Sequence, residues 1–210
     1  MKWIIFDLDG TVADSRHRSH HIALEVGTTV THESGIDGVI REKLPEHASG
    51  ETGYRIRWSD GDDYVSLHSE VERWRNVDWD AWDADTLKDG RIEAVIHVLQ
   101  ALRAKSMLDG HEVGGEDAVC IMFLTARGER ARSLTEQWLI EHDLFHPEWG
   151  DVLVMRGIDD IRRDTIIKRE LIERMRDEGH EFLFAFEDRR LVANMLRELG
   201  IFVFHVADYD

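Results

Sequence analysis

Short apolar runs alternate with amphipathic stretches along most of the chain. Because the runs are continuously apolar, they are typical of strands that are buried on both faces of a sheet. Between them, apolar residues recur at helical spacing. The alternation predicts a doubly wound parallel α/β sheet of five strands, Rossmann-like, with right-handed crossovers. The expected strands are 3–6, 117–125, 151–156, 181–188 and 201–206, and the expected helices are 91–104, 129–142, 164–178 and 189–199.

Residues 15–89 interrupt this rhythm. They are polar, rich in glycine and acidic residues, and broken by Pro45 and by SDGDD at 59–63. We expect an inserted lobe, part helical, between two halves of a core that comprises 1–14 and 90–210. The alternative is a partly disordered loop. Large aromatic residues favour the lobe because they bury enough surface to order it. These are Trp58, Trp74, Trp79 and Trp82.

Composition limits the possible surroundings and partners. The chain has 210 residues, 42% of them hydrophobic, and a formal net charge of -17. Such acidity disfavours a long nucleic-acid track, so a phosphate-bearing partner would need local cations or a metal. Cys120 is the single cysteine, which excludes an intramolecular disulfide and favours the reducing cytoplasm. The sequence shows no signal peptide and no apolar run of about 18 residues, so we expect no membrane association.

Polar residues collect where the predicted strands end. Asp7 and Asp9 follow the first strand, Thr125 ends the second, and the pair at 187–188 ends the fourth. Lys168 lies on the helix before that fourth strand. The carboxyl ends of parallel strands share one edge of a sheet, where α/β proteins bind ligands. We therefore expect these side chains to converge.

The convergence suggests phosphate chemistry at a metal. Two carboxylates two residues apart repel each other unless a cation lies near them. Mg²⁺ prefers a few carboxylates together with phosphate and water, and Asp188 can complete its shell. Lys168 can neutralise phosphate charge, and the Thr125 hydroxyl can donate to a phosphate oxygen. One carboxylate can attack phosphorus while a second acts as acid and then base.

DLDGT with Asp7 and Asp9, LTAR with Thr125, then Lys168, and EDR with Asp188 together resemble the four motifs of the haloacid dehalogenase (HAD) superfamily. The resemblance implies an HAD core with a mobile cap inserted after the first strand, and a Mg²⁺-dependent phosphatase. Asp7 would form an aspartyl-phosphate, and Asp9 would protonate the leaving oxygen and then activate water. Asp7, the Asp9 backbone carbonyl and Asp188 would hold Mg²⁺. Thr125 and Lys168 would bind the phosphoryl group.

The neighbours of these motif residues are further candidates. Ala126 and Arg127 follow Thr125 and are expected to help bind phosphate. Arg127 and Arg189 are candidates for contact with the substrate phosphate, or are ordinary surface arginines. Glu187 either binds the metal beside Asp188 or only supports it.

The C-terminal half has a closer resemblance. LTARGERARSLTEQWLIEH, DTIIKRELIERM and FEDRRLVANMLRELGIFVFHVADYD resemble the phosphatase domain of phage-type polynucleotide kinases, and WDAWDAD fits the same group. This implies hydrolysis of 3'-phosphates at nucleic-acid ends. Two positions depart from that pattern: Ala126 stands where glycine is frequent, and Glu187 precedes Asp188 where two aspartates are usual. No G-x-x-x-x-G-K-[ST] occurs, so we expect no P-loop kinase module in this chain.

Two other functions stay open. A 5'-(deoxy)nucleotidase acting on mononucleotides has similar length and motifs, and the charge of -17 favours a small substrate. A non-catalytic phosphoacceptor module, such as a receiver domain, also combines acids, threonine and lysine on a doubly wound sheet. Its phosphorylated aspartate lies on a later strand, however, and a receiver does not need an acid like Asp9. The expected partner is a phosphorylated nucleotide or nucleic-acid end; the oligomeric state and a separate kinase partner stay open.

Overall fold

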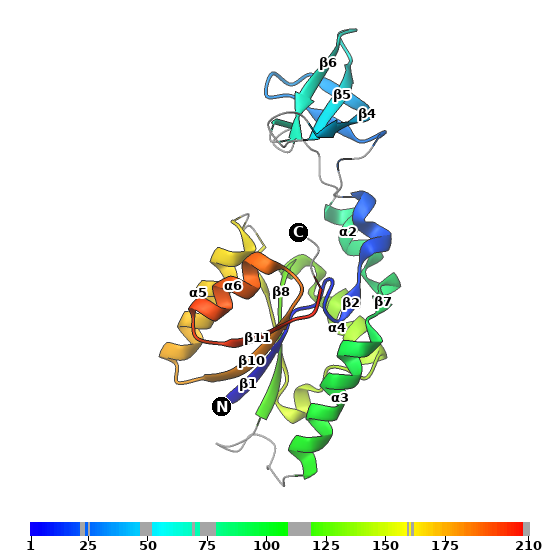
Figure 1. Ribbon diagram of the computed structural model, residues 1–210. Helices are drawn as coiled ribbons and strands as arrows, with labels where there is room; N and C mark the ends of the chain where they lie inside the picture. Colours follow the sequence, from blue (N-terminus) through cyan, green and yellow to red (C-terminus); the bar gives the residue numbers. More distant parts are fainter. Residues whose placement is uncertain are drawn as a thin grey trace. The chain divides into compact units, whose positions relative to one another are not determined.

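The computed structural model describes residues 1–21, 24, 26–46, 52–68, 70–71, 79–108, 119–158, 160 and 162–207. The chain forms two compact units (Figure 1). Unit 1 comprises Met1–Arg16 and Asp83–Asp210, and unit 2 comprises His17–Trp82. Unit 2 is thus an insertion in unit 1, and its role as a cap stays a prediction.

Within the described residues, unit 1 is built on a parallel sheet of five strands in the order β11-β10-β1-β8-β9. This confirms the predicted α/β class and the parallel sheet. The strands are β1 (Lys2–Phe6), β8 (Val119–Gly128), β9 (Val152–Arg156), β10 (Glu181–Glu187) and β11 (Phe202–His205). The helices are α3 (Glu93–Leu108), α4 (Arg132–Glu141), α5 (Asp164–Asp177) and α6 (Arg190–Glu198), with short 3-10 turns at Asp85–Lys88, Glu129–Ala131 and Pro147–Trp149.

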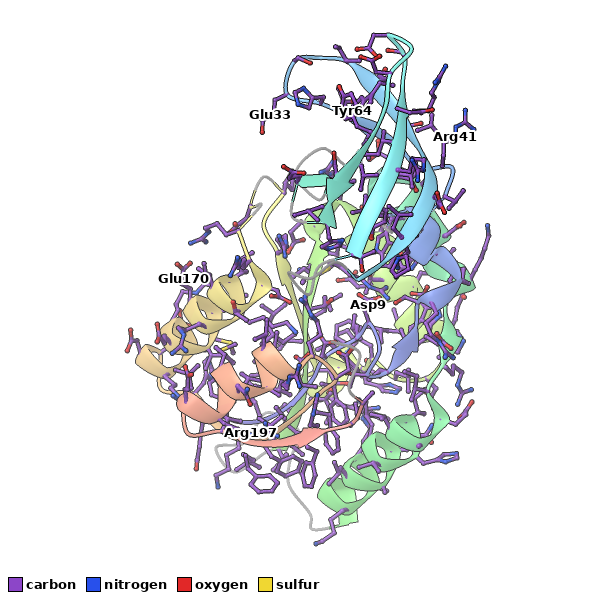
Figure 2. The ribbon with its side chains drawn as sticks, turned by 45° about the horizontal axis from the view of Figure 1, so that its top comes forward. Asp9, Glu33, Arg41, Tyr64, Glu170 and Arg197 are labelled. Carbon is purple, nitrogen blue, oxygen red and sulfur yellow. The ribbon has the colours of Figure 1, made fainter. Side chains whose placement is uncertain are left out.

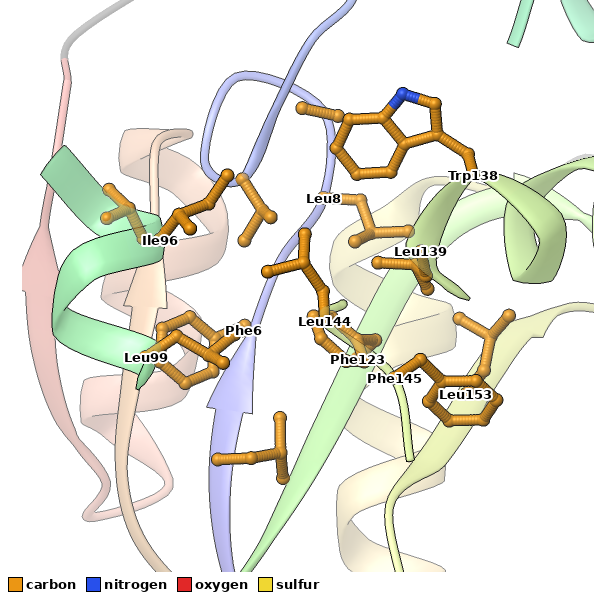
Figure 3. Packing of buried hydrophobic residues seen from close by; sticks show 14 of the residues in the cluster. Phe6, Leu8, Ile96, Leu99, Phe123, Trp138, Leu139, Leu144, Phe145 and Leu153 are labelled. Carbon is orange, nitrogen blue, oxygen red and sulfur yellow. The ribbon is translucent and has the colours of Figure 1, made fainter. Parts of the chain in front are cut away.

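Helices cover both faces of this sheet, which explains why its strands are continuously apolar. Alternate residues of β1 point to opposite faces: Ile4 and Phe6 pack with residues of α3 and α4, whereas Trp3 and Ile5 pack with residues of α5 and α6. Figure 3 shows Phe6 on the first of these faces, together with Ile96 and Leu99 of α3. Strand β8 alternates in the same way. The sheet is therefore buried on both sides, and its central strand β1 lies between β8 and β10.

The strand order contains a switch point beside β1. From β1 the chain proceeds through β8 to β9 on one side, and then crosses to β10 and β11 on the other. Ligands of doubly wound sheets bind at such a point, outside the carboxyl ends of the strands. In this fold the switch point places the residues after β1, β8 and β10 at one edge.

A short ladder joins the places where the chain leaves unit 1 and returns to it. Strand β2 (Ala13–Asp14) pairs antiparallel with β7 (Gly90–Arg91). The amide of Ile92 then donates to the carbonyl of Val12 at 3.0 Å. The two backbone segments that flank the insertion are therefore hydrogen-bonded to each other.

Unit 2 contains an antiparallel sheet that the expectation of a partly helical lobe did not foresee. Its described strands run in the order β3-β4-β5-β6, and Figure 2 labels Tyr64 and Arg41 on this unit. In the sequence, glycines and the charged residues of the exposed face obscure the alternation of apolar and polar positions in these strands. The strands are β3 (Thr29–Thr31), β4 (Asp37–Glu46), β5 (Thr52–Trp58) and β6 (Asp63–Leu67), preceded by a 3-10 turn at Arg16–His21 and followed by α2 (Trp79–Ala84).

The tryptophans of the insertion whose side chains are described, Trp58 and Trp82, are buried. Trp58 is 3% exposed and packs with Ile40 and Ile56, and Trp82 is 9% exposed beneath the Arg18 guanidinium. Trp74 and the side chain of Trp79 lie outside the described residues. Most of the segment 106–117, between α3 and β8, also lies outside them. Among helices of the described residues, none is long and apolar enough to cross a membrane.

A buried ion pair joins elements at the amino edge of the parallel sheet. The Arg103 guanidinium on α3 contacts the Asp151 carboxylate and donates to the Leu144 carbonyl at 3.0 Å. Asp151 also accepts from the amides of Ile121, at 3.3 Å, and His146, at 2.9 Å. Its side chain is 3% exposed, so the interaction has little solvent screening.

We expect Asp151→Asn to lower the free energy of unfolding by about 3 kcal/mol, because it leaves Arg103 buried without a countercharge. Urea denaturation followed by circular dichroism measures the loss. The control is Glu198→Ala, which removes an exposed partner of Arg169 and should cost below about 1 kcal/mol. Equal losses in the two variants would contradict the role given to the buried pair.

Candidate active site

The loop after β1 presents both aspartates of the first motif. The Leu8 carbonyl accepts hydrogen bonds from the amides of Thr11, Val12 and Ala13 at 3.1, 2.9 and 2.8 Å. Gly10 has a φ of 81°, a conformation that a side chain would disfavour. The tight turn thus fixes the backbone around Asp9, and Figure 2 labels Asp9 in this region.

Asp7 is held by a buried lysine. Lys168 Nζ on α5 lies 2.6 Å from Asp7 Oδ1 and 2.9 Å from Glu187 Oε2 at the end of β10. The side chains of all three are at most 8% exposed. One cation therefore bridges two carboxylates from distant parts of the sequence, as the sequence led us to expect for Asp7 and Lys168.

Burial sets the protonation behaviour of this group. Burial, together with the nearby Glu187 carboxylate, raises the pKa of Asp7 to about 7, although Lys168 opposes the shift. Burial also raises the pKa of Glu187 against the same lysine. Burial by itself would lower the pKa of Lys168, but the two carboxylates outweigh it and raise that pKa. The cluster therefore contains more negative charge than one ammonium stabilises.

Asp188 is the third carboxylate of the cluster. Thr11 Oγ1 donates to Asp188 Oδ1 at 3.4 Å, and His205 Nε2 lies 2.6 Å from the Asp188 carbonyl oxygen. Burial and the Asp7 carboxylate raise the pKa of Asp188 to about 6. Thr11 and His205 were not foreseen as site residues. Thr11 was visible in the DGT motif, whereas His205 carried no sequence signal.

The three carboxylates fit a divalent cation. Among the described residues, Asp7, Glu187 and Asp188 each offer an oxygen, and these atoms lie within 4.8 Å of one another. Hard oxygen donors with a net negative charge suit Mg²⁺. The geometry therefore places Glu187 beside Asp188 in the group that could bind metal.

Asp9 is held by a second buried cation. The Arg127 guanidinium donates through Nε to Asp9 Oδ2 at 2.9 Å and through Nη2 to Asp9 Oδ1 at 2.7 Å. Nη2 also donates to Asp89 Oδ2 at 2.7 Å, and Nη1 lies 3.5 Å from Thr135 Oγ1. The Asp9 side chain is 30% exposed, so it can still meet a substrate.

The Arg127 guanidinium is almost inaccessible, with its side chain 1% exposed. Burial by itself would lower its pKa, but the Asp9 and Asp89 carboxylates outweigh that effect and raise it. Contact of Arg127 with a substrate phosphate stays a prediction. Asp89 was not foreseen; the only signal was its place just after the WDAWDAD segment.

The second motif lies at the end of β8. Thr125 is buried, and its Oγ1 accepts from the Arg127 amide at 3.1 Å. The Ala126 carbonyl accepts from Arg156 Nε at 2.9 Å. Both residues are thus fixed at the carboxyl edge, next to the strand that carries Asp7. Their phosphate contacts stay predictions.

Arg189, in contrast, turns to another acid. Its guanidinium contacts the Asp164 carboxylate at the start of α5, and its side chain is 51% exposed. Its amide donates to Glu187 Oε1 at 3.1 Å. Asp164 was not foreseen, although its position four residues before Lys168 places both on one helical face.

Comparison with known proteins gives the family. Residues 69–210 match the family described as the polynucleotide kinase PNKP phosphatase domain. The chain belongs to this family. It is a HAD-type phosphatase. The family thus confirms the predicted enzyme class and disfavours the alternative of a non-catalytic phosphoacceptor module. No curated protein matches the chain significantly.

Solved structures share the fold. One chain of "Structure of the Pnkp1/Rnl/Hen1 RNA repair complex" aligns with a TM-score of 0.53 at 21% identity, and one of "Structure of Pnkp1/Rnl/Hen1 complex" with 0.56 at 20%. The alignments cover 100% of this chain but 43% and 47% of those chains. The chain therefore spans less than half the length of these structural neighbours.

The family match starts at residue 69, within the last part of the insertion, so it does not include β1 or its two aspartates. The structure nevertheless pairs β1 with both β8 and β10 of the matched segment, at the centre of the sheet. The first 16 residues and the matched segment from Asp83 onward are thus parts of one folded unit. The long insertion between them separates the first motif from the rest in sequence.

We expect Mg²⁺ to raise the melting temperature of the protein, because a cation that binds the folded carboxylate cluster stabilises it by about 2.7 kcal/mol at a hundredfold excess over Kd. Thermal denaturation across a Mg²⁺ titration measures the shift. Asp188→Asn should reduce it strongly, whereas Asp177→Asn, at an exposed position on α5, should retain it. A full shift in Asp188→Asn would argue against the cluster.

Proposed function

We propose that the chain is a Mg²⁺-dependent phosphomonoester hydrolase that removes 3'-phosphates from polynucleotide ends through an aspartyl-phosphate. The observation that carries the chemistry is the different setting of two aspartates on one loop. Asp7 is buried beside Lys168 and two further acids, whereas Asp9 is partly exposed and oriented by Arg127. Asp7 has a cation beside the oxygen that would attack phosphorus, and Asp9 is exposed enough to reach the leaving oxygen for proton transfer.

In the first step an Asp7 oxygen bonds to phosphorus while the bond from phosphorus to the leaving oxygen breaks. Asp9 gives its proton to that oxygen, so the leaving group departs as an alcohol. In the second step water attacks the aspartyl-phosphate, Asp9 takes a proton from the water, and inorganic phosphate leaves with Asp7 regenerated. Water is the only co-substrate that the two steps consume.

The remaining candidates stabilise charge. Mg²⁺, held by Asp7, the Asp9 backbone carbonyl, Asp188 and Glu187, would offset the charge of the phosphoryl oxygens. Lys168 carries a fixed positive charge within 2.6 Å of the nucleophile. Thr125 and the Ala126 amide lie near the end of β8 at the same edge and would hydrogen-bond the phosphoryl group, with Arg127 as a further candidate.

The family supports a polynucleotide substrate. The matched domain is named for polynucleotide kinase, and the structural neighbours come from RNA repair complexes. The net charge of -17 favours the second candidate, a 5'-(deoxy)nucleotidase, because a long polyanion would be repelled. A 3'-terminal phosphate needs only local capture, which is compatible with the acidic surface.

We expect Asp7→Asn to reduce phosphate release by at least about 10⁴-fold, because an amide cannot act as the nucleophile. Release of inorganic phosphate from a 3'-phosphorylated oligonucleotide measures it. Asp177→Asn is the control and should keep full activity. Phosphate release at the wild-type rate by folded Asp7→Asn would contradict the mechanism.

A second experiment tests the substrate. We expect kcat/KM for a 3'-phosphorylated oligonucleotide to exceed that for a 5'-deoxynucleotide by at least about tenfold, because contacts beyond the phosphate add transition-state binding. The same enzyme preparation is assayed with both compounds and with an aryl phosphate. A large preference for the mononucleotide would establish the nucleotidase instead.

A further inference from the structure

Asp89 is a buried acid outside the group of three carboxylates that could hold a metal. Its side chain is fully buried, and its Oδ2 accepts from Arg127 Nη2 at 2.7 Å. That same nitrogen donates to Asp9 Oδ1 at 2.7 Å. One nitrogen of Arg127 therefore donates to both the reactive carboxylate and the buried one.

The backbone of Asp89 is itself fixed. Its carbonyl accepts from the indole Nε1 of Trp138 at 2.9 Å, and its amide donates to the Thr86 carbonyl at 3.1 Å. Trp138 is fully buried among the residues between α4 and the sheet (Figure 3). The hydrophobic core thus determines where the Asp89 carboxylate lies.

An arginine side chain has four rotatable bonds, and a partly exposed carboxylate alone would restrain it weakly. A second, buried carboxylate on the same nitrogen fixes the plane of the guanidinium. That plane in turn fixes both oxygens of Asp9, because Arg127 donates to each of them. The chain of contacts runs from the core through Asp89 and Arg127 to Asp9.

We propose that Asp89 is a positioning residue that orients Asp9, through Arg127, for proton transfer to the leaving oxygen. The proposal rests on the proposed function, in which Asp9 is the proton donor. Asp89 does not touch the reacting atoms. Its loss should therefore slow the step in which the bond to the leaving oxygen breaks and that oxygen takes the Asp9 proton.

The leaving group distinguishes this role from a general structural one. A p-nitrophenolate leaves readily without a proton, whereas a sugar alkoxide requires one. The parameter kcat/KM reports steps up to the first irreversible one, here the departure of the leaving group. Misplacement of Asp9 should therefore reduce kcat/KM for the sugar phosphate far more than for p-nitrophenyl phosphate.

The experiment compares wild type, Asp89→Ala, Asp89→Asn and Asp9→Asn on a 3'-phosphorylated oligonucleotide and on p-nitrophenyl phosphate. For Asp89→Ala we expect a loss of about 10²-fold in kcat/KM on the oligonucleotide and below about threefold on the aryl ester. Asp9→Asn should show the same direction, more strongly. Asp89→Asn keeps the side-chain volume and an oxygen acceptor, and carries the test if Asp89→Ala does not fold.

Asp151→Asn is the matched control, since it also removes a buried aspartate from an arginine, at the opposite edge of the sheet. It should leave the ratio of the two kcat/KM values unchanged despite its lower stability. If folded Asp89 variants lost kcat/KM equally on both substrates, or lost none, the positioning role of Asp89 would be overturned and the proposed function would stand. A wild type inactive on both substrates would overturn the proposed function, and the role of Asp89 with it.

Discussion

Carboxylates can share the carboxyl edge of this sheet only because two buried cations lie between them. Lys168 bridges Asp7 and Glu187, and Arg127 bridges Asp9 and Asp89. Each aspartate of the first motif therefore has its own cation, which separates two charges only two residues apart. The division also leaves the two carboxylates unlike: one is buried in an excess of negative charge, and the other is partly exposed in a fixed orientation.

The rest of the fold serves this arrangement. Parallel strands bring the ends of β1, β8 and β10 to one edge, and helices on both faces keep the lysine and the arginine away from water. Both cations keep their charge because the surrounding carboxylates outweigh the effect of burial. A cation lost from either position would leave acids buried without a countercharge, so the site and the stability of the fold are coupled.

Much of unit 1 could be predicted from the sequence, because buried parallel strands and amphipathic helices have strong periodic patterns. The convergence of Asp7, Glu187 and Asp188 followed from their places at strand ends, and Lys168 was expected to join them from the helix before the fourth strand. The partners Asp89, Asp164 and His205 could not be found, because a buried polar contact between distant segments has no periodic pattern. The sheet of unit 2 was missed for a related reason: bulges and charged residues interrupt the alternation in β4 and β5.

The β2–β7 ladder has a consequence for how such a chain can change over time. The segment by which the chain leaves unit 1 is paired with the segment by which it returns. Closing the loop between them costs conformational entropy, and the contacts of unit 1 largely offset that cost. Segments of very different length and fold could occupy 17–82 without altering the sheet. The insertion is thus free to diverge faster than the catalytic unit, which agrees with a family match that begins only after most of it.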